Sequence, residues 1–349
     1  MNHTPSINSS VECRVQSVED CISLHTTLYT ATTVRQSAGH MHTRPIFIAA
    51  VILAIVVQLP TQVVADRLTV VASVFPIFDF AREVAGPVAD VRLLLPPGVD
   101  PHSWEPRPSD IVELSRADIF LYTSERLEPW ADSFARTIRK KDAVSIEVMD
   151  SLGFSGSEER HNSTKVIDGG DDHARDPHFW LNLSLSARTV EMIGELLANN
   201  DPENRELYKD SASNYARKLT QLDEAFMVGL KECGTRQLVT GGHAAFGHLA
   251  RQYDLEQIAV YGLSPDAEPS PRHLAGIVNL VKMNNIKSIF SEELMNPRMT
   301  EVLSQETGTK ILTLNPAGNL TAAQWLEGLT FIEIMEHNLE ILREGLYCE

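Results

Sequence analysis

The sequence predicts an α/β protein of two domains, each with a mainly parallel sheet flanked by helices, joined by one long interdomain helix. Three observations predict this class. Apolar, β-branched segments alternate with segments of helical periodicity in the first part of the chain, and the same alternation returns in the last part. A single long helical pattern separates the two blocks. We therefore expect domains at 66–202 and 233–349, with the interdomain helix at 203–232.

The first block contains four expected strands and four expected helices. Gly86-Pro87 ends the first helix, Pro96-Pro97-Gly98 ends the second strand, and Ser109 is the expected N-cap of the second helix. The polar, acidic segment 155–176 is expected to form a surface loop. The expected strands are 67–73, 88–95, 117–122 and 144–148, and the expected helices are 78–85, 109–115, 130–140 and 184–199.

A long helix is expected over 203–231, where apolar residues recur at about 3.6-residue spacing and the rise per residue implies roughly 40 Å. A helix of this length between two α/β blocks is a candidate for a rigid spine. The second block then repeats the alternation, with Pro271 near the first turn of one helix. Its expected strands are 237–240, 256–261, 286–290 and 310–314, and its expected helices are 244–253, 270–284, 297–307 and 322–342.

The N-terminal region indicates export. Residues 45–60 form an apolar run that is preceded by Arg44 and followed by the small-residue site Val63-Val64-Ala65. This pattern predicts a cleavable signal peptide at 41–65, because the run is short for a membrane span. Residues 1–40 are then a mis-called start upstream of Met41, and a genuine N-terminal extension is the alternative.

Charge and cysteine content narrow the class. The formal net charge of −17 disfavours nucleic acid and anionic lipid as partners, and it suits a secreted protein that collects cations. Cys233 and Cys348 are the cysteines that remain after the leader. An export compartment permits a disulfide between them, and two buried thiols are the alternative.

Three histidines stand in three separate turn-rich contexts: His102 in GVDPHSWEPRPSD, His178 in DPHFWLNL and His243 in TGGHAAFGHLA. A lone histidine in a loop is most often a hydrogen-bonded polar residue, but three in such contexts favour a metal site built from several loops. Neutral imidazole is the commonest protein ligand for zinc, and three of them leave one position of a tetrahedron to fill.

The expected strand order places these residues together. Ligands of open α/β sheets bind beyond the carboxyl ends of the strands. His102 follows the second strand, His243 follows the strand at 237–240, and Asn315 follows the strand at 310–314, whereas His178 precedes a helix. Two positions come from each block, so the predicted metal site lies in the cleft between the domains, with Asn315 at the fourth position.

Other residues near these motifs have open interpretations. Glu292 or Glu293 either orients a ligand histidine or is a helix N-terminal charge. Trp104 and Trp180 either shield the metal or simply pack. Of the remaining histidines, His248 is expected at the surface or behind a ligand, and His273 and His337 are expected to be structural. His161 and His173 belong to the acidic loop with Asp171 and Asp172, a solvated linker more than a zinc-collecting tether.

The chain resembles the periplasmic metal-binding proteins of ABC importers for zinc and manganese, the ZnuA/TroA-like cluster, over residues 67–345. The three histidine segments quoted above are similar to the first, second and third ligand loops of that family. The resemblance implies two α/β domains with limited hinge motion and His102, His178 and His243 as ligands. A histidine at the third position, as here, goes with zinc in the family, whereas glutamate goes with manganese.

The chain departs from the family in one residue and in one loop. An aspartate is usual where this chain has Asn315, so the fourth ligand is in doubt, with Glu293 or water as alternatives. Many zinc-specific members also carry a histidine-rich loop, whereas residues 155–176 contain only His161 and His173.

The expected function is therefore capture of Zn²⁺ in the interdomain cleft and delivery to the membrane permease of an ABC importer. A periplasmic location, a monomeric state, a possible periplasmic zinc chaperone as partner, and no catalytic activity accompany this expectation. A manganese (Mn²⁺) carrier or a metal-dependent adhesin on the same fold is the alternative. A secreted zinc hydrolase with Glu293 as general base is disfavoured because no HExxH-type helix is present.

Overall fold

The computed structural model describes residues 67–138, 142–154, 176–265 and 269–349. The predictions for 1–40, for the signal peptide at 41–65 and for the acidic loop with His161 and His173 therefore lie outside the described residues. Within the described ranges, no helix has both the length and the apolar character that crossing a membrane requires.

The first sheet contains four parallel strands in the order β2-β1-β3-β4. Their bounds are Thr69–Ala72 for β1, Asp90–Leu93 for β2, Ile119–Tyr122 for β3 and Val144–Glu147 for β4. The predicted parallel sheet is confirmed, with each strand a few residues shorter than its apolar segment. The central strands β1 and β3 are apolar on both sides, as expected where helices cover both faces of a sheet, whereas the edge strands β2 and β4 are only partly buried.

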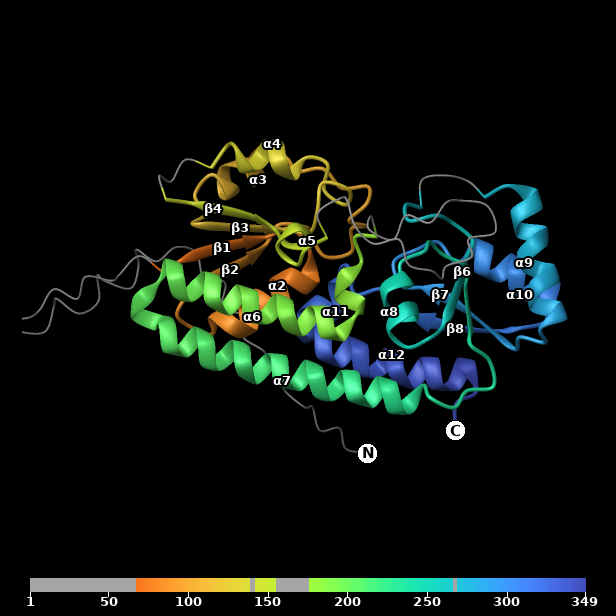
Figure 1. Ribbon diagram of the computed structural model, residues 1–349. Coiled ribbons are helices and arrows are strands. Elements are labelled where there is room, and N and C mark those ends of the chain that lie inside the picture. The colour runs from red at the N-terminus through yellow and green to blue at the C-terminus, as the bar shows by residue number, and fades with distance from the viewer. Residues whose placement is uncertain (1–66, 139–141, 155–175, 266–268) are drawn as a thin grey trace, which may run out of the picture. The chain divides into compact units, whose positions relative to one another are not determined.

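Helices cover this sheet on its two faces (Figure 1). On one face, α3 (Pro108–Leu114) and α4 (Ala131–Ala135) enclose a small core that includes Phe120 and Trp130. On the other face lies α2 (Phe75–Ala85), and α6 (Leu183–Asn200) packs against α2. The short helix α5 (Val148–Ser151) follows β4, and a 3₁₀ turn at Phe179–Leu181 precedes α6.

The long helix is α7 (Arg205–Gly229), preceded by a 3₁₀ turn at Pro202–Asn204. Its 25 residues span about 37 Å. The predicted apolar stripe is confirmed as its buried face: Tyr208, Ala212, Tyr215, Leu219, Leu222 and Phe226. Gly194 of α6 allows the two helices to approach closely, because a Cβ there would lie 2.5 Å from Cβ of Ala212.

The second sheet repeats the topology of the first, with parallel strands in the order β6-β5-β7-β8. One face carries α9 (Pro271–Met283) and α10 (Arg298–Thr307), and α8 (Gly247–Gln252) and α12 (Phe331–Leu346) lie toward the other (Figure 1). The strands are Gln237–Thr240 (β5), Glu256–Ala259 (β6), Ser288–Glu292 (β7) and Lys310–Leu314 (β8).

The helix expected at 130–140 is shorter than predicted, since α4 ends at Ala135, and two further local expectations are wrong. The helix expected at 322–342 is two helices, because Gly328 adopts a left-handed conformation (φ 73°) that ends α11 (Ala322–Glu327). Thr330 then begins α12 with a capping box that it forms with Glu333. The second correction concerns α3, which begins at Pro108 with Arg107 at the N-cap, so Ser109 does not cap it.

One hydrophobic core joins the two halves of the chain, defined here as the residues before α7 and the residues after it. Phe80 of α2 and Phe331 of α12 meet edge to face at 4.9 Å between ring centroids, within a single large cluster. Beside them, the buried carboxylate of Asp79 accepts hydrogen bonds from the Tyr215 hydroxyl (3.0 Å) and the Phe331 backbone N–H (3.1 Å). This group ties α2, α7 and α12 together.

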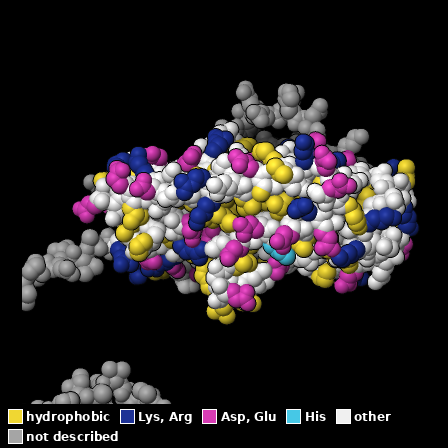
Figure 2. All heavy atoms as spheres, turned by 90° about the horizontal axis from the view of Figure 1, so that it is seen from below, with side chains coloured by type: hydrophobic (Ala, Val, Ile, Leu, Met, Phe, Trp, Pro, Cys, Tyr) yellow, Lys and Arg dark blue, Asp and Glu magenta, His cyan; other side chains and the backbone are white. Residues whose placement is uncertain are grey.

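Figure 2 shows one surface of the molecule, viewed from below Figure 1, on which acidic, basic and apolar side chains are interspersed. The lysine and arginine side chains on this face do not gather into a continuous basic area.

The structure pairs Cys233 with Cys348 in a disulfide, so the first of the two alternatives for these cysteines holds. Cys233 follows α7 closely, and Cys348 is the second-last residue. The bond spans 115 positions of sequence, and chain-entropy arguments give such a loop about 4–5 kcal/mol of stabilisation.

We predict that replacing both Cys233 and Cys348 by serine lowers the unfolding free energy by a few kcal/mol in guanidinium titration. A reducing agent should destabilise the natural chain and leave the double variant unchanged; equal stability of the two proteins would contradict the prediction.

A buried carboxyl group predicts a pH dependence of stability. Glu128 lies after β3 and accepts hydrogen bonds from Ser73 Oγ (2.5 Å) and from the backbone N–H groups of Thr123 (3.2 Å) and Ser124 (3.0 Å). Burial raises the pKa of Glu128 to about 7. Because the folded state binds this proton more tightly than the unfolded chain does, its stabilising contribution is complete below about pH 4.5. That contribution is lost as the pH rises toward 7.

We therefore predict that the natural protein loses roughly 3 kcal/mol of unfolding free energy through this group between pH 4.5 and pH 7.5. The Glu128→Gln variant should lack this part of the pH dependence, even if its stability is lower throughout. Chemical denaturation at several pH values measures the difference, and Glu306→Gln on the exposed side of α10 is the control. Parallel pH profiles of the natural chain and Glu128→Gln would rule the prediction out.

Candidate metal centre

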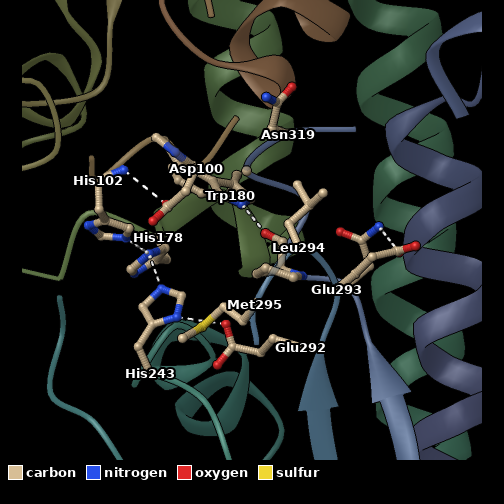
Figure 3. A pocket seen from close by; sticks show the side chains of 14 residues that line it. Asp100, His102, His178, Trp180, His243, Glu292, Glu293, Leu294, Met295 and Asn319 are labelled. Carbon is tan, nitrogen blue, oxygen red and sulfur yellow. Dashed lines mark hydrogen bonds and ion pairs between the residues drawn. The ribbon is translucent and has the colours of Figure 1, made fainter. Parts of the chain in front are cut away.

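The structure brings the three predicted histidines together. The Nε2 atom of His178 lies 3.2 Å from that of His102 and 3.2 Å from that of His243. A nitrogen of each ring can be chosen so that all three lie within 4.8 Å of one another, and these are the only such His, Cys, Asp or Glu group of three found among the described residues. Figure 3 shows the three imidazoles turned toward a common point.

The spacing of these nitrogens suits a tetrahedral metal ion. With Zn–N bonds of about 2.0–2.1 Å, two ligand nitrogens of a tetrahedral site lie about 3.3 Å apart. The two measured Nε2 separations of 3.2 Å match that edge. His178 and His243 are buried and His102 is partly buried, so the point on which they converge is largely removed from solvent.

Asp176 orients His178. Its Oδ1 atom accepts hydrogen bonds from the backbone N–H of His178 (3.0 Å) and from Nδ1 of the same ring (2.8 Å). Since a carboxylate only accepts, the hydrogen of the neutral ring sits on Nδ1 and the Nε2 lone pair faces the other imidazoles. A carboxylate in this position fixes the tautomer of a ligand histidine and increases its basicity.

Glu292 occupies the corresponding place behind His243, with Oε2 2.6 Å from Nδ1. The contact is close but bent, since neither Glu292 oxygen nor Nδ1 of His243 has a partner at hydrogen-bond geometry in the described structure. The Glu292 side chain ends β7 and is fully buried. It fits only because Gly242 has no side chain: a Cβ there would lie 1.8 Å from Oε1 of Glu292.

Burial and the neighbouring charges set the protonation of the site. Burial, and then the nearby His178 and His243, lower the pKa of His102 to about 2, and burial also lowers the pKa of His178. Burial opposes protonation of His243 as well, but the charge of Glu292 outweighs it and raises the pKa. Among the three rings, His243 is therefore the one whose protonated form the neighbouring charge favours.

The loop that carries His102 is braced from the second half of the chain. Asn319 donates two hydrogen bonds from Nδ2, to the carbonyl oxygens of Pro96 (2.8 Å) and Val99 (2.8 Å). The backbone N–H of Gly98 donates to the carbonyl of Leu320 at 2.7 Å. These bonds cross from one half to the other beside the site, so the position of His102 depends on both halves.

The histidines open into a cavity of about 30 Å³. This volume holds about two water-sized groups. Trp180 forms one wall: it is fully buried, its ring lies edge-on to His178 at 5.4 Å, and its Nε1 donates to the carbonyl of Pro316 at 2.8 Å. Trp104 packs instead edge to face against Trp130 and does not line this cavity.

Asn315 and Glu293 line the same cavity but bind each other. Nδ2 of Asn315 donates to Oε2 of Glu293 (2.7 Å), and Oδ1 of Asn315 accepts the backbone N–H of Ala317 (2.7 Å). The second oxygen of Glu293 accepts from Nε2 of Gln324 at 3.0 Å. Figure 3 shows Glu293 on the side of the cavity away from the imidazoles. The polar atoms of both candidate fourth ligands are thus committed to protein partners.

The remaining described histidines lie elsewhere. His248 is buried in α8 behind His178, and its Nε2 lies 3.0 Å from the carbonyl oxygen of Asp176. His273 bonds the carbonyl of Ala259 at 3.1 Å from α9, and His337 is exposed on α12. The hydrogen bond of His273 agrees with the structural role expected of it, whereas the exposed His337 does not have the structural role that was expected.

Sequence reasoning missed Asp176, although a signal was present. Asp100-Pro101-His102 and Asp176-Pro177-His178 are the same tripeptide. In both, Oδ1 of the aspartate accepts the backbone N–H of the histidine two residues later, at 3.1 Å and 3.0 Å. The repeated aspartate shapes the turn that presents each histidine. Asn319 carried no comparable signal, because its partners are backbone carbonyls far away in sequence.

Comparison with known proteins identifies the family of the chain. Residues 70–345 match the family model described as zinc-uptake complex component A, periplasmic (ZnuA). The high-affinity zinc uptake system protein ZnuA of Bacillus subtilis is 35% identical over 282 residues, which cover 80% of this chain and 88% of that protein. The zinc-binding lipoprotein AdcA of Streptococcus pneumoniae is 35% identical over 301 residues, which cover 86% of this chain but 60% of AdcA.

Solved structures show the same fold. The Zn(II)-bound ZnuA-like domain of Streptococcus pneumoniae AdcA superposes with a TM-score of 0.66 at 34% identity, covering 80% of this chain and 99% of that domain. The laminin-binding protein Lmb of Streptococcus agalactiae, described as an adhesin with metal-transporting activity, gives a TM-score of 0.67 at 30% identity over 80% and 99% of the two chains. With its sequence matched from residue 70 to residue 345, the chain belongs to the ZnuA family of periplasmic zinc-uptake components.

Proposed function

We propose that this chain is an exported solute-binding protein that captures Zn²⁺ between its two halves and delivers it to the permease of an ABC importer. His102, His178 and His243 are the proposed ligands. Membership of the ZnuA family and the similarity to zinc-uptake proteins support the transport role. The residues at 66–202 and 233–349 form the two proposed metal-binding lobes, with 203–232 between them.

The convergence of the three Nε2 atoms is the observation that carries the proposal. Two buried carboxylates stand behind two of the rings, so the ring nitrogens that remain free for a ligand point at one another at 3.2 Å. Such an arrangement sets the ring nitrogens at a spacing that one cation can bridge. Three imidazole ligands suit zinc better than manganese, which prefers carboxylate and other oxygen donors.

Charge balance supports a divalent cation. Three neutral imidazoles leave the two positive charges of zinc uncompensated, and the nearest buried acids are Asp176 and Glu292, one behind His178 and one behind His243. Two ionised carboxylates at these positions offset the charge without touching the metal. We therefore propose water as the fourth ligand, because Asn315 and Glu293 are hydrogen-bonded to other protein groups.

The cavity supports a carrier over a hydrolase. Sites that bind organic ligands have volumes of about 300–1,000 Å³. The cavity beside the histidines, at about 30 Å³, accommodates an ion and one water molecule. Glu293, the general base that a hydrolase would use, is held by Asn315 and Gln324 rather than directed at the metal position.

We predict that the mature protein binds one zinc ion and that alanine at His102, His178 or His243 weakens binding by at least about 100-fold, since each removes a ligand from a four-coordinate site. Competition with a fluorescent chelator measures the affinity, and metal analysis measures the stoichiometry. His337→Ala on exposed α12 is the matched control and should bind as the natural chain does. Tight, stoichiometric zinc in a variant lacking all three site histidines would overturn the assignment.

A separate prediction concerns Asn315. If water is the fourth ligand, Asn315→Ala should change zinc affinity by less than about tenfold, well below the effect of losing a histidine. Its cost should appear in stability, because Glu293 loses one partner and the Ala317 N–H loses its acceptor. Chelator competition and thermal unfolding separate the two effects. A loss of affinity as large as that of His178→Ala would identify Asn315 as a ligand.

A further inference from the structure

One further histidine, His248, is buried behind the proposed metal site. His248 belongs to α8, is 3% exposed and does not line the cavity. Its Nε2 lies 3.0 Å from the carbonyl oxygen of Asp176, and Nη2 of Arg251 lies 3.0 Å from its Nδ1. Because an arginine only donates, Nδ1 of His248 accepts from it and the ring hydrogen sits on Nε2. His248 is therefore set up to donate to Asp176.

The beginning of α8 packs against Asp176 at two points. The His248 ring lies above its backbone carbonyl, with Nε2 also 3.9 Å from Oδ2 of the carboxylate. The preceding residue, Gly247, leaves room for that carboxylate, because a Cβ at this position would lie 2.7 Å from Oδ2. Asp176 is 2% exposed, so these contacts form much of its surroundings.

The contact links the two halves of the chain. Asp176 and His178 precede α7, whereas Gly247, His248 and Arg251 follow it. The hydrogen-bonded series runs from Arg251 through His248 and Asp176 to the Nδ1 of His178. The segment that supplies His243 thus also carries His248, five residues later. His248 bonds the backbone carbonyl of Asp176, and the carboxylate of Asp176 orients His178 from the other half.

We propose that His248 is a positioning residue of the zinc site, which fixes Asp176 and through it the direction of the His178 Nε2 lone pair. The proposal rests on the proposed zinc function. It makes zinc affinity depend on a contact between the halves that involves no metal ligand. Loss of a direct partner of a ligand histidine typically costs 10- to 100-fold in metal affinity, and the loss of His248, which acts through such a partner, is measured against that range.

The test compares two replacements that differ in one hydrogen bond. His248→Phe keeps a ring against Phe154, whose ring lies edge-on at 5.9 Å, but cannot donate. His248→Gln keeps an Nε2 donor at a similar reach. We expect His248→Phe to weaken zinc by about 10- to 100-fold, with one zinc still bound, and to release it faster. His248→Gln should stay within about threefold of the natural protein. If His248→Phe does not fold, His248→Asn, whose shorter amide does not reach Asp176, takes its place.

His273→Phe is the matched control, because His273 makes the same type of bond, Nε2 to a backbone carbonyl at 3.1 Å, far from the site in α9. It should leave zinc binding unchanged. Natural affinity in His248→Phe would overturn the proposal. The proposal is also overturned if the Gln and Phe variants lose zinc affinity equally while the metal-free proteins unfold at the same midpoint. His248 would then act through packing and not through its hydrogen bond. If His178→Ala still binds zinc tightly, the proposed zinc function itself is wrong. That result is distinct from a failure of the proposal about His248.

Discussion

The interaction on which the structure depends is the mutual approach of three imidazole nitrogens inside the protein. The Nε2 atom of His178 lies 3.2 Å from those of His102 and His243, and rings on separate loops keep this spacing only if the surrounding residues hold them there. Asp176 holds the ring of His178 from behind, and Glu292 holds the ring of His243. Asn319 holds the loop that carries His102. The site is therefore a property of the whole fold, because its supports come from both sides of α7.

The shared core explains how separate loops keep this accuracy. Phe80 and Phe331 pack across the two halves, and Asp79 joins three helices beside them. Buried apolar packing resists continuous deformation. Two sheets with the same strand order thus act as one support for ligands far apart in sequence, which is why a carrier of this kind needs no single helix that supplies all its ligands.

Most of the architecture could be predicted from the sequence because it follows local patterns. Periodicity and turn residues determine the strands β5 and β8 and the buried face of α7. They also determine that strand ends converge near His102 and His243. The missed features depend on contacts distant in sequence. The position of Asn315 at a strand end could be predicted, whereas the hydrogen bond of its amide to Glu293 follows from side-chain geometry alone. The break at Gly328 was a local signal that the apolar pattern on either side obscured.

The size of the cavity has a consequence for how ions are told apart. A divalent ion in water carries a full hydration shell, and about 30 Å³ leaves no room for one. An ion must therefore exchange nearly all its waters for imidazole nitrogens before it can occupy the site. Zinc does this readily, but magnesium dehydrates reluctantly and gains little from nitrogen ligands. At the proposed site, zinc is thus favoured over magnesium because imidazole nitrogens replace the water of zinc well and the water of magnesium poorly.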